Sequence, residues 1–88
     1  MSFLGLDPSA VRSLAAQMRN ASSEIQQLTQ SLTTQLQNAH WVGPDRERFV
    51  GEWNGQHVSQ LHAVMNALTE AAQAAEQNAS QQEQASNS

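Results

Sequence analysis

The three histidines are the side chains best suited to bind a metal ion or to transfer protons near neutral pH. His57 and His62 are five residues apart, which is about 500° of rotation on an α-helix, so they do not share a face as a metal-binding pair four residues apart would. His40 is distant in the sequence, and the lack of cysteine in these 88 residues excludes thiolate ligands and disulfides. We therefore expect no metal and no other cofactor.

The serines and arginines predict neither a catalytic site nor a nucleic-acid site. A catalytic triad needs a serine, a histidine and an acid held together beside a pocket, and no such set stands out from chance among the many serines. The four arginines, at positions 12, 19, 46 and 48, are scattered in a chain of net charge −4. A nucleic-acid-binding surface is instead a basic stripe. We expect neither an enzyme nor a nucleic-acid-binding protein.

The stretch Trp41-Val42-Gly43-Pro44 places a large apolar side chain where regular structure stops. Gly43 is suited to end a helix in a left-handed conformation, and Pro44 disfavours the α conformation at the residue before it. Tryptophan carries a large apolar surface that is costly to expose to water. These residues predict a turn that carries an aromatic anchor between two regular segments.

The segment before this turn is predicted to be a helix over residues 8–41. Asp7 can cap the backbone N–H groups of the first turn, and Pro8 fits the first helical position. Leu6 and Val11 are placed for a hydrophobic staple across this start. Apolar residues then recur in two rows of seven-residue spacing: Val11, Met18, Ile25 and Leu32, and Leu14, Ala21 and Leu28. This heptad pattern predicts packing against another long helix.

The segment after the turn is predicted to be a second helix over residues 44–79. Asp45 and Glu47 lie near its start, where the helix dipole favours negative charge. Phe49 and Trp53 are one turn apart on the same face, which favours a core position for Trp53. Residues 81–88 contain no large apolar side chain and are expected to form a disordered tail, as residues 1–6 are expected to form a flexible arm. The predicted domain is an all-α helical hairpin over residues 7–80.

One hairpin cannot cover both apolar stripes, because each helix carries apolar residues around a broader arc than its neighbour can bury. Leaving a Leu, Ile or Met side chain in water costs about 1.5–3 kcal/mol relative to burial. Doubling the hairpin gives a four-helix bundle, which covers the second face. We expect a dimer, with a second copy or with a related chain. The predicted interface consists of Val11, Leu14, Met18, Ile25, Leu28, Leu32, Leu61, Val64 and Leu68.

The Trp41-Val42-Gly43 turn between two long amphipathic helices, in a chain near one hundred residues long, resembles the WXG family. The likeness covers about residues 7–80 and includes aromatic residues after the turn, at Phe49 and Trp53. Members are small early-secreted-antigen-like proteins of actinobacteria and Firmicutes that form homo- or heterodimeric four-helix bundles. The resemblance implies that the chain is made in the cytoplasm and secreted as a folded dimer by a type VII secretion system. Its start lacks the pattern of a classical cleaved signal peptide, in agreement with such a route.

Many family members or their partners also carry a C-terminal Tyr-x-x-x-Asp/Glu export signal, whereas this chain has no tyrosine. Three explanations are open: a dimer partner supplies the signal, another recognition operates, or the chain is not exported. In the family, the Trp-x-Gly turn and the tail of the partner's second helix resemble a composite surface for the secretion ATPase. The resemblance thus implies that Trp41, Val42 and Gly43 are recognised by that ATPase. The alternative is that Trp41 plugs the open end of the hairpin, and the two roles are compatible.

Three functions from different classes are consistent with these features. The first is the exported dimer described above. The second is an intracellular chaperone-like partner for the Trp-x-Gly domain of a larger secreted toxin. The third is a membrane-active helix pair, which the negative charge and the absence of lysine disfavour. No segment is apolar over the roughly 20 residues that span a bilayer, so we expect no membrane insertion.

Overall fold

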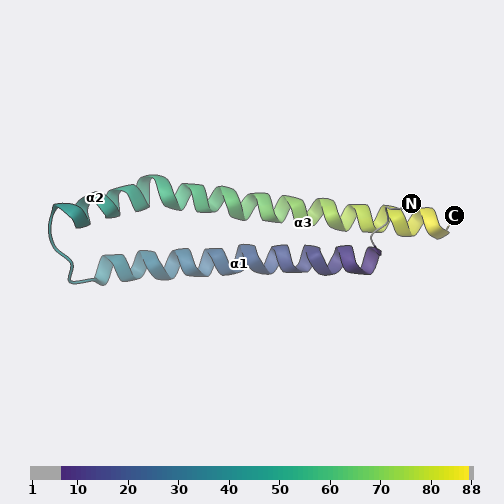
Figure 1. Ribbon diagram of the computed structural model, residues 1–88, viewed down its shortest axis with the longest axis horizontal. Coiled ribbons are helices and arrows are strands. Elements are labelled where there is room, and N and C mark those ends of the chain that lie inside the picture. The colour runs from purple at the N-terminus through teal and green to yellow at the C-terminus, as the bar shows by residue number, and fades with distance from the viewer. Residues whose placement is uncertain (1–6, 88) are drawn as a thin grey trace.

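The computed structural model describes residues 7–87, with the side chains described as far as Ala85. Its helices are α1 (Pro8–Asn38), α2 (Pro44–Glu52), the π-helical turn η1 (Trp53–His57) and α3 (Val58–Asn87). As Figure 1 shows, α2, η1 and α3 form one continuous arm that runs antiparallel to α1, giving a rod of 65 × 17 × 15 Å. The predicted all-α helical hairpin is therefore confirmed. The flexible arm predicted for residues 1–6 lies outside the described residues.

The start of α1 is capped as its sequence predicts. The Asp7 side chain accepts a hydrogen bond from the backbone N–H of Ser9 at 3.3 Å, and Pro8 occupies the first helical position. The backbone N–H of Val11 donates to the Asp7 carbonyl at 3.1 Å. The predicted staple cannot be assessed, because Leu6 lies outside the described part of the chain. Capping by Asp7 fixes where α1 begins, and thus where its N-terminal turn meets α3.

The helix α1 ends at Asn38, which corrects the predicted end at residue 41. Ala39 is already extended, with φ = −72° and ψ = 142°. Continued helix would carry Trp41 along the axis of α1, whereas the extended connection lets its ring contact Phe49 on the opposite arm. The end of α1 at Asn38 is therefore compatible with the contact between Trp41 and Phe49, which a longer helix would not allow.

Gly43 has a different role from the one expected, because it begins α2 and does not end α1. It is the N-cap of α2, with φ = 131° and ψ = 175°, and its carbonyl accepts from the backbone N–H of Glu47 at 3.2 Å. This region of backbone space is occupied almost only by glycine. Pro44 follows at the first helical position, and Asp45 and Glu47 lie in the first turn as predicted.

The contact between α1 and α3 is a narrow seam of small and polar residues. On α1 the buried residues are Val11, Ala15 and Thr29, and on α3 they are Ala72 and Ala79. Larger residues such as Met18 and Met65 are only half-buried beside them. Small side chains at these positions let the two helix axes approach closely. The seam therefore leaves much of the bulkier apolar surface outside it.

The helix α3 continues through Asn87, past the predicted end at residue 79 and through residues expected to form a disordered tail. Figure 1 shows α3 reaching beyond the first turn of α1. Ala79 is fully buried, and Glu83 binds Arg12 on α1. The contacts of Ala79 and Glu83 thus attach the C-terminal part of α3 to α1, although its composition is polar. The predicted tail residue Ser88 lies outside the described residues.

The π-helical turn η1 interrupts the second arm directly after α2. Its defining hydrogen bond runs from the backbone N–H of Val58 to the carbonyl of Trp53, five residues back. Residues 49, 53, 57 and 61 are spaced by four, and three such steps rotate around a regular α-helix by about 120°. A π-turn holds more residues per turn and absorbs this rotation. It thereby keeps Trp53 and Leu61 on one side of the arm.

No helix within residues 7–87 combines the length and the apolar character needed to cross a bilayer.

Candidate functional site

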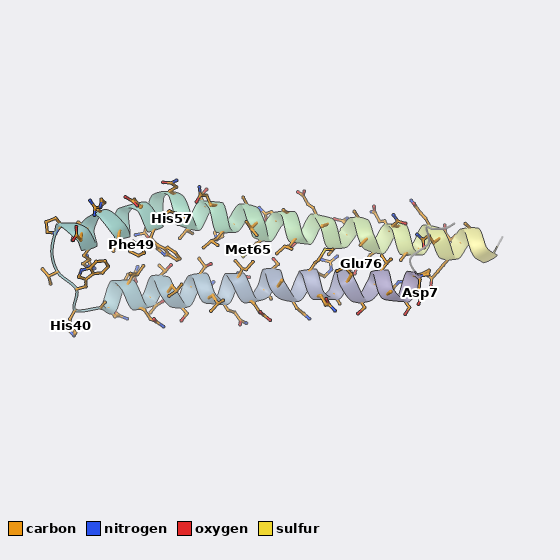
Figure 2. The ribbon with its side chains drawn as sticks, in the orientation of Figure 1. Asp7, His40, Phe49, His57, Met65 and Glu76 are labelled. Carbon is orange, nitrogen blue, oxygen red and sulfur yellow. The ribbon has the colours of Figure 1, made fainter. Side chains whose placement is uncertain are left out.

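The connection between the two arms presents Trp41 and Val42 to solvent. Trp41 is 42% exposed and Val42 is 91% exposed, whereas Gly43 is half-buried. His40, just before them, points away from both arms (Figure 2). The structure thus brings together the three residues predicted to be recognised, at one end of the rod. An almost fully exposed valine contributes nothing to the core. Fold stability therefore does not explain why residue 42 is a valine.

A row of aromatic rings leads from the turn along the second arm. Trp41 lies 6.0 Å from Phe49 between ring centroids, and Phe49 lies 6.4 Å from Trp53. Trp53 in turn meets His57 at 6.3 Å, edge to face. We call Trp41, Phe49, Trp53 and His57 the aromatic row. Trp41 therefore packs against Phe49 and remains partly exposed, so its ring is accessible at this end of the rod.

The aromatic row is joined to α1 by one hydrogen bond between side chains. The indole N–H of Trp53 donates to the Thr33 hydroxyl at 2.8 Å, and that hydroxyl donates to the Thr29 carbonyl at 2.7 Å. The Thr29 hydroxyl donates to the Ile25 carbonyl at 2.6 Å. Sequence reasoning missed both threonines. The available signal was their four-residue spacing, which places both hydroxyls on one face of a helix otherwise rich in Leu and Gln.

The hairpin has an apolar side, formed by Leu14, Leu28 and Leu32 of α1 and Val64 of α3. All four are exposed, and Leu28 most of all at 63%. Beside them is a groove of about 320 Å³ between the arms. The groove is lined by Ile25, Leu28, Thr29, Leu32, Trp53 and Leu61. This side thus continues from the aromatic row along the hairpin.

The other side of the seam, which we call the polar side, carries ion pairs and further hydrogen bonds between the arms. Ser22 donates to the Met65 carbonyl at 3.2 Å, near Gln26, His62 and Asn66. Figure 2 shows Met65 in the space between the arms. Arg12, Arg19 and Gln26 share one face of α1, because they are spaced by seven. The polar side is therefore chemically distinct from the apolar side.

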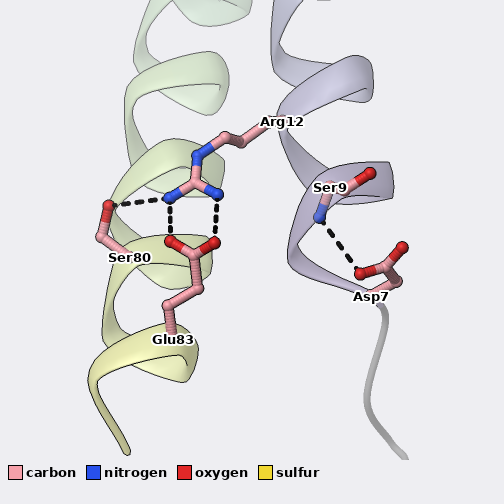
Figure 3. A network of polar contacts seen from close by, with 5 residues as sticks. All are labelled: Asp7, Ser9, Arg12, Ser80 and Glu83. Atoms are coloured by element: carbon pink, nitrogen blue, oxygen red, sulfur yellow. Dashed lines mark hydrogen bonds and ion pairs between the residues drawn. The ribbon is translucent and has the colours of Figure 1, made fainter. Parts of the chain in front are cut away.

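Two ion pairs fasten the far end of the hairpin. Arg12 makes a bidentate contact with Glu83, with Nη1 at 2.7 Å from Oε2, and also contacts Ser80 at 3.4 Å (Figure 3). Arg19 contacts Glu76 at 2.5 Å. Hydrogen bonding to these arginines, chiefly, holds the pKa of the Glu76 and Glu83 carboxyls below the usual range. The same bonds raise the pKa of both guanidinium groups.

The nine residues predicted to form a dimer interface divide into two groups. Val11, Met18, Ile25, Leu61 and Leu68 are buried or half-buried in the single hairpin. Leu14, Leu28, Leu32 and Val64 are exposed. The first group therefore already contacts the sibling helix, and the second offers new surface to a partner. Contact between two hairpins remains a prediction.

The described residues contain no group of three or more histidine or acidic side chains placed to hold a metal ion. No protein-family model, curated protein or solved structure matches the chain. The assignment of function therefore depends on the hairpin and on the residues of its turn.

Proposed function

We propose that this chain is a WXG-type helical hairpin, exported by a type VII secretion system as a folded dimer. The observation that carries the proposal is the turn, where Trp41 and Val42 are exposed between two long helices. Anchor residues at protein interfaces are enriched in tryptophan, because one ring contributes a large contact area. A tryptophan held at the end of a rod by Phe49 is suited to such recognition.

The proposed partners are a second hairpin and the secretion ATPase. The apolar side would pack against the other hairpin, which is a second copy or a related chain. The turn would contact the ATPase together with the tail of the partner's second helix. Since this chain has no tyrosine, we propose that a heterodimer partner supplies the Tyr-x-x-x-acid export signal.

Export of two variants tests this function in a bacterium with an intact type VII system and a partner carrying the tyrosine signal. Trp41→Ala should abolish export while the dimer stays helical. Because the indole is already 42% exposed, its loss should cost less than the about 3–5 kcal/mol of a fully buried tryptophan. His40→Ala, at the neighbouring position that points away from both arms, should be exported normally.

Normal secretion of Trp41→Ala would contradict the proposed recognition. If Trp41→Ala loses export only in proportion to lost folding, the ring is a plug and not a signal. Secretion of the wild-type chain without a partner would contradict the dependence on a partner. These outcomes are separated by measuring helicity and thermal unfolding of the same variants.

A further inference from the structure

Thr33 is the residue of α1 that connects to the aromatic row. Its hydroxyl hydrogen is directed to the Thr29 carbonyl, 2.7 Å away, so its oxygen lone pairs remain for the indole N–H of Trp53 at 2.8 Å. A hydroxyl provides one donor and two acceptor positions, and a bond that occupies the donor fixes its rotation. Thr33 is half-buried, which protects these bonds from competing water. The orientation of the acceptor for Trp53 is therefore fixed by a bond within α1 itself.

The indole of Trp53 transmits this fixed orientation toward the turn. Its ring stacks on Phe49 with planes inclined by 21°, and Phe49 meets Trp41 with planes inclined by 41°. Aromatic pairs at such centroid distances prefer particular orientations, because the ring edge is positive and the face negative. The orientation of Trp41 thus depends on Phe49, and that of Phe49 on Trp53.

The π-helical turn η1 makes this arrangement geometrically possible. Without its wider turn, Trp53 would rotate around the arm relative to Leu61 and lose its approach to α1. Gly51 lies just before the π-turn and Gly55 lies in its middle. A Cβ added to either glycine would have no atom within 4 Å. The π-turn is therefore not required by crowding at these glycines. Its visible consequence is the alignment of Trp53 with Thr33.

We propose that Thr33 is a positioning residue for Trp41, acting through Trp53 and Phe49. Its hydroxyl fixes the Trp53 indole, and the stacked rings then hold the Trp41 ring in the orientation that the turn presents. This inference rests on the proposed function only for its consequence, recognition of the oriented Trp41 ring by a protein partner. The orientation itself is measurable in the isolated chain.

The test uses the full chain labelled with 5-fluorotryptophan, whose two fluorine NMR signals are assigned with Trp41→Phe and Trp53→Phe. In Thr33→Val, which keeps the shape but removes the acceptor, both signals should shift, and that of Trp41 should move toward the free amino acid. Thr33→Ser retains a hydroxyl and should restore both. Thr34→Val is the matched control, because the Thr34 hydroxyl makes the same bond to a carbonyl four residues back and, among the described residues, accepts no hydrogen bond from an indole; neither signal should move.

A shift of the Trp53 signal without any change at Trp41 would overturn the positioning role. If Thr33→Val fails to fold, Trp53→Phe keeps a stacked ring without the N–H donor and should displace the Trp41 signal in the same way. An unchanged Trp41 signal in that variant would also overturn the inference.

The export assay separates this inference from the proposed function. Thr33→Val should lose export while its helicity is retained, and Thr33→Ser should recover it. Displaced Trp41 with normal export of both Thr33→Val and Trp41→Ala would contradict the proposed function and leave the positioning role standing. If the Trp41 signal does not move in Thr33→Val and export is lost only in Trp41→Ala, the positioning role is contradicted and the proposed function is supported.

Discussion

Gly43 joins the exposed turn to α2 through a backbone conformation that side chains disfavour. Its φ of 131° is accessible to glycine, because a Cβ at such an angle meets the residue's own backbone. A Cβ added at this position would have no other atom within 4 Å. The requirement for glycine is therefore entirely local to the backbone.

Replacement of Gly43 by valine should lower the free energy of unfolding by at least about 1 kcal/mol, because a β-branched residue is strained in this region. Chemical denaturation followed by circular dichroism measures the change. Gly51→Ala is the matched control: Gly51 lies inside α2 with open space around it, so alanine there should stabilise by about 0.5–1 kcal/mol. Equal stability of Gly43→Val and wild type would show that the turn adopts another conformation in solution.

At the scale of the helices, local signals predicted the starts of the elements correctly. Asp7 with Pro8, and Pro44 at the first position of α2, act through their own backbone neighbours, so the sequence is sufficient to locate both starts. The N-cap role of Gly43 was not predicted, because this glycine was expected to end the preceding helix. The end of α1 was predicted three residues too late, because helix propensity carries no information on the contact that Trp41 makes with Phe49 on the opposite arm.

The composition of the seam was also not predictable from hydrophobic spacing alone. The heptad rows predicted packing against another long helix without separating the sibling helix from a second hairpin, and Leu14 and Leu28 are exposed on the apolar side of the single hairpin. Ala15, Ser22 and Thr29 form a second row with the same spacing and face α3. Periodicity identifies the rows but does not decide which row meets which neighbour, because packing distance favours small residues. The turn residues were predictable, whereas the Thr33–Trp53 contact required the structure.

Acidification should weaken the far end of the hairpin. The pKa values of Glu76 and Glu83 are lower in the folded chain than in the unfolded chain, where glutamate titrates at about 4.3. Their contribution to stability is therefore complete above the unfolded value and is lost as the pH falls through the folded values. The double variant Glu76→Gln/Glu83→Gln should melt below wild type at pH 7, and this difference should shrink at lower pH.

Both carboxylates are solvent-accessible, so the effect should be small and should also diminish at high ionic strength. Thermal melts at neutral pH in low and high salt provide this second comparison. A difference in melting temperature that is independent of both pH and salt would show that the ion pairs do not stabilise the fold.

At the scale of the whole molecule, the apolar side predicts dimerisation. Leu28 is 63% exposed in the single hairpin, so Leu28→Asp should change the stability of a monomer little. In a dimer the same change buries an unpaired charge between hairpins, at a cost of several kcal/mol. Sedimentation velocity at micromolar concentration, with the related partner present if the chain alone does not dimerise, should show dissociation of Leu28→Asp.

Gln27→Asp is the control for this experiment, because it adds the same charge at a neighbouring exposed position of α1. It should leave the sedimentation coefficient unchanged. A wild-type chain that stays a stable, fully helical monomer both alone and with its partner would contradict dimerisation.

The contrast between the two sides of the hairpin also limits how far assembly can proceed. Among the described residues, large exposed aliphatic side chains outside the turn lie on the apolar side, while amides and ion pairs occupy the polar side. A subunit that adheres through the same patch as its neighbour closes the assembly, whereas filaments need two different complementary patches. Once the apolar side is covered, the described residues outside the turn present no second exposed aliphatic patch. Growth would stop at two subunits, and this hairpin would not polymerise although its helices expose apolar side chains.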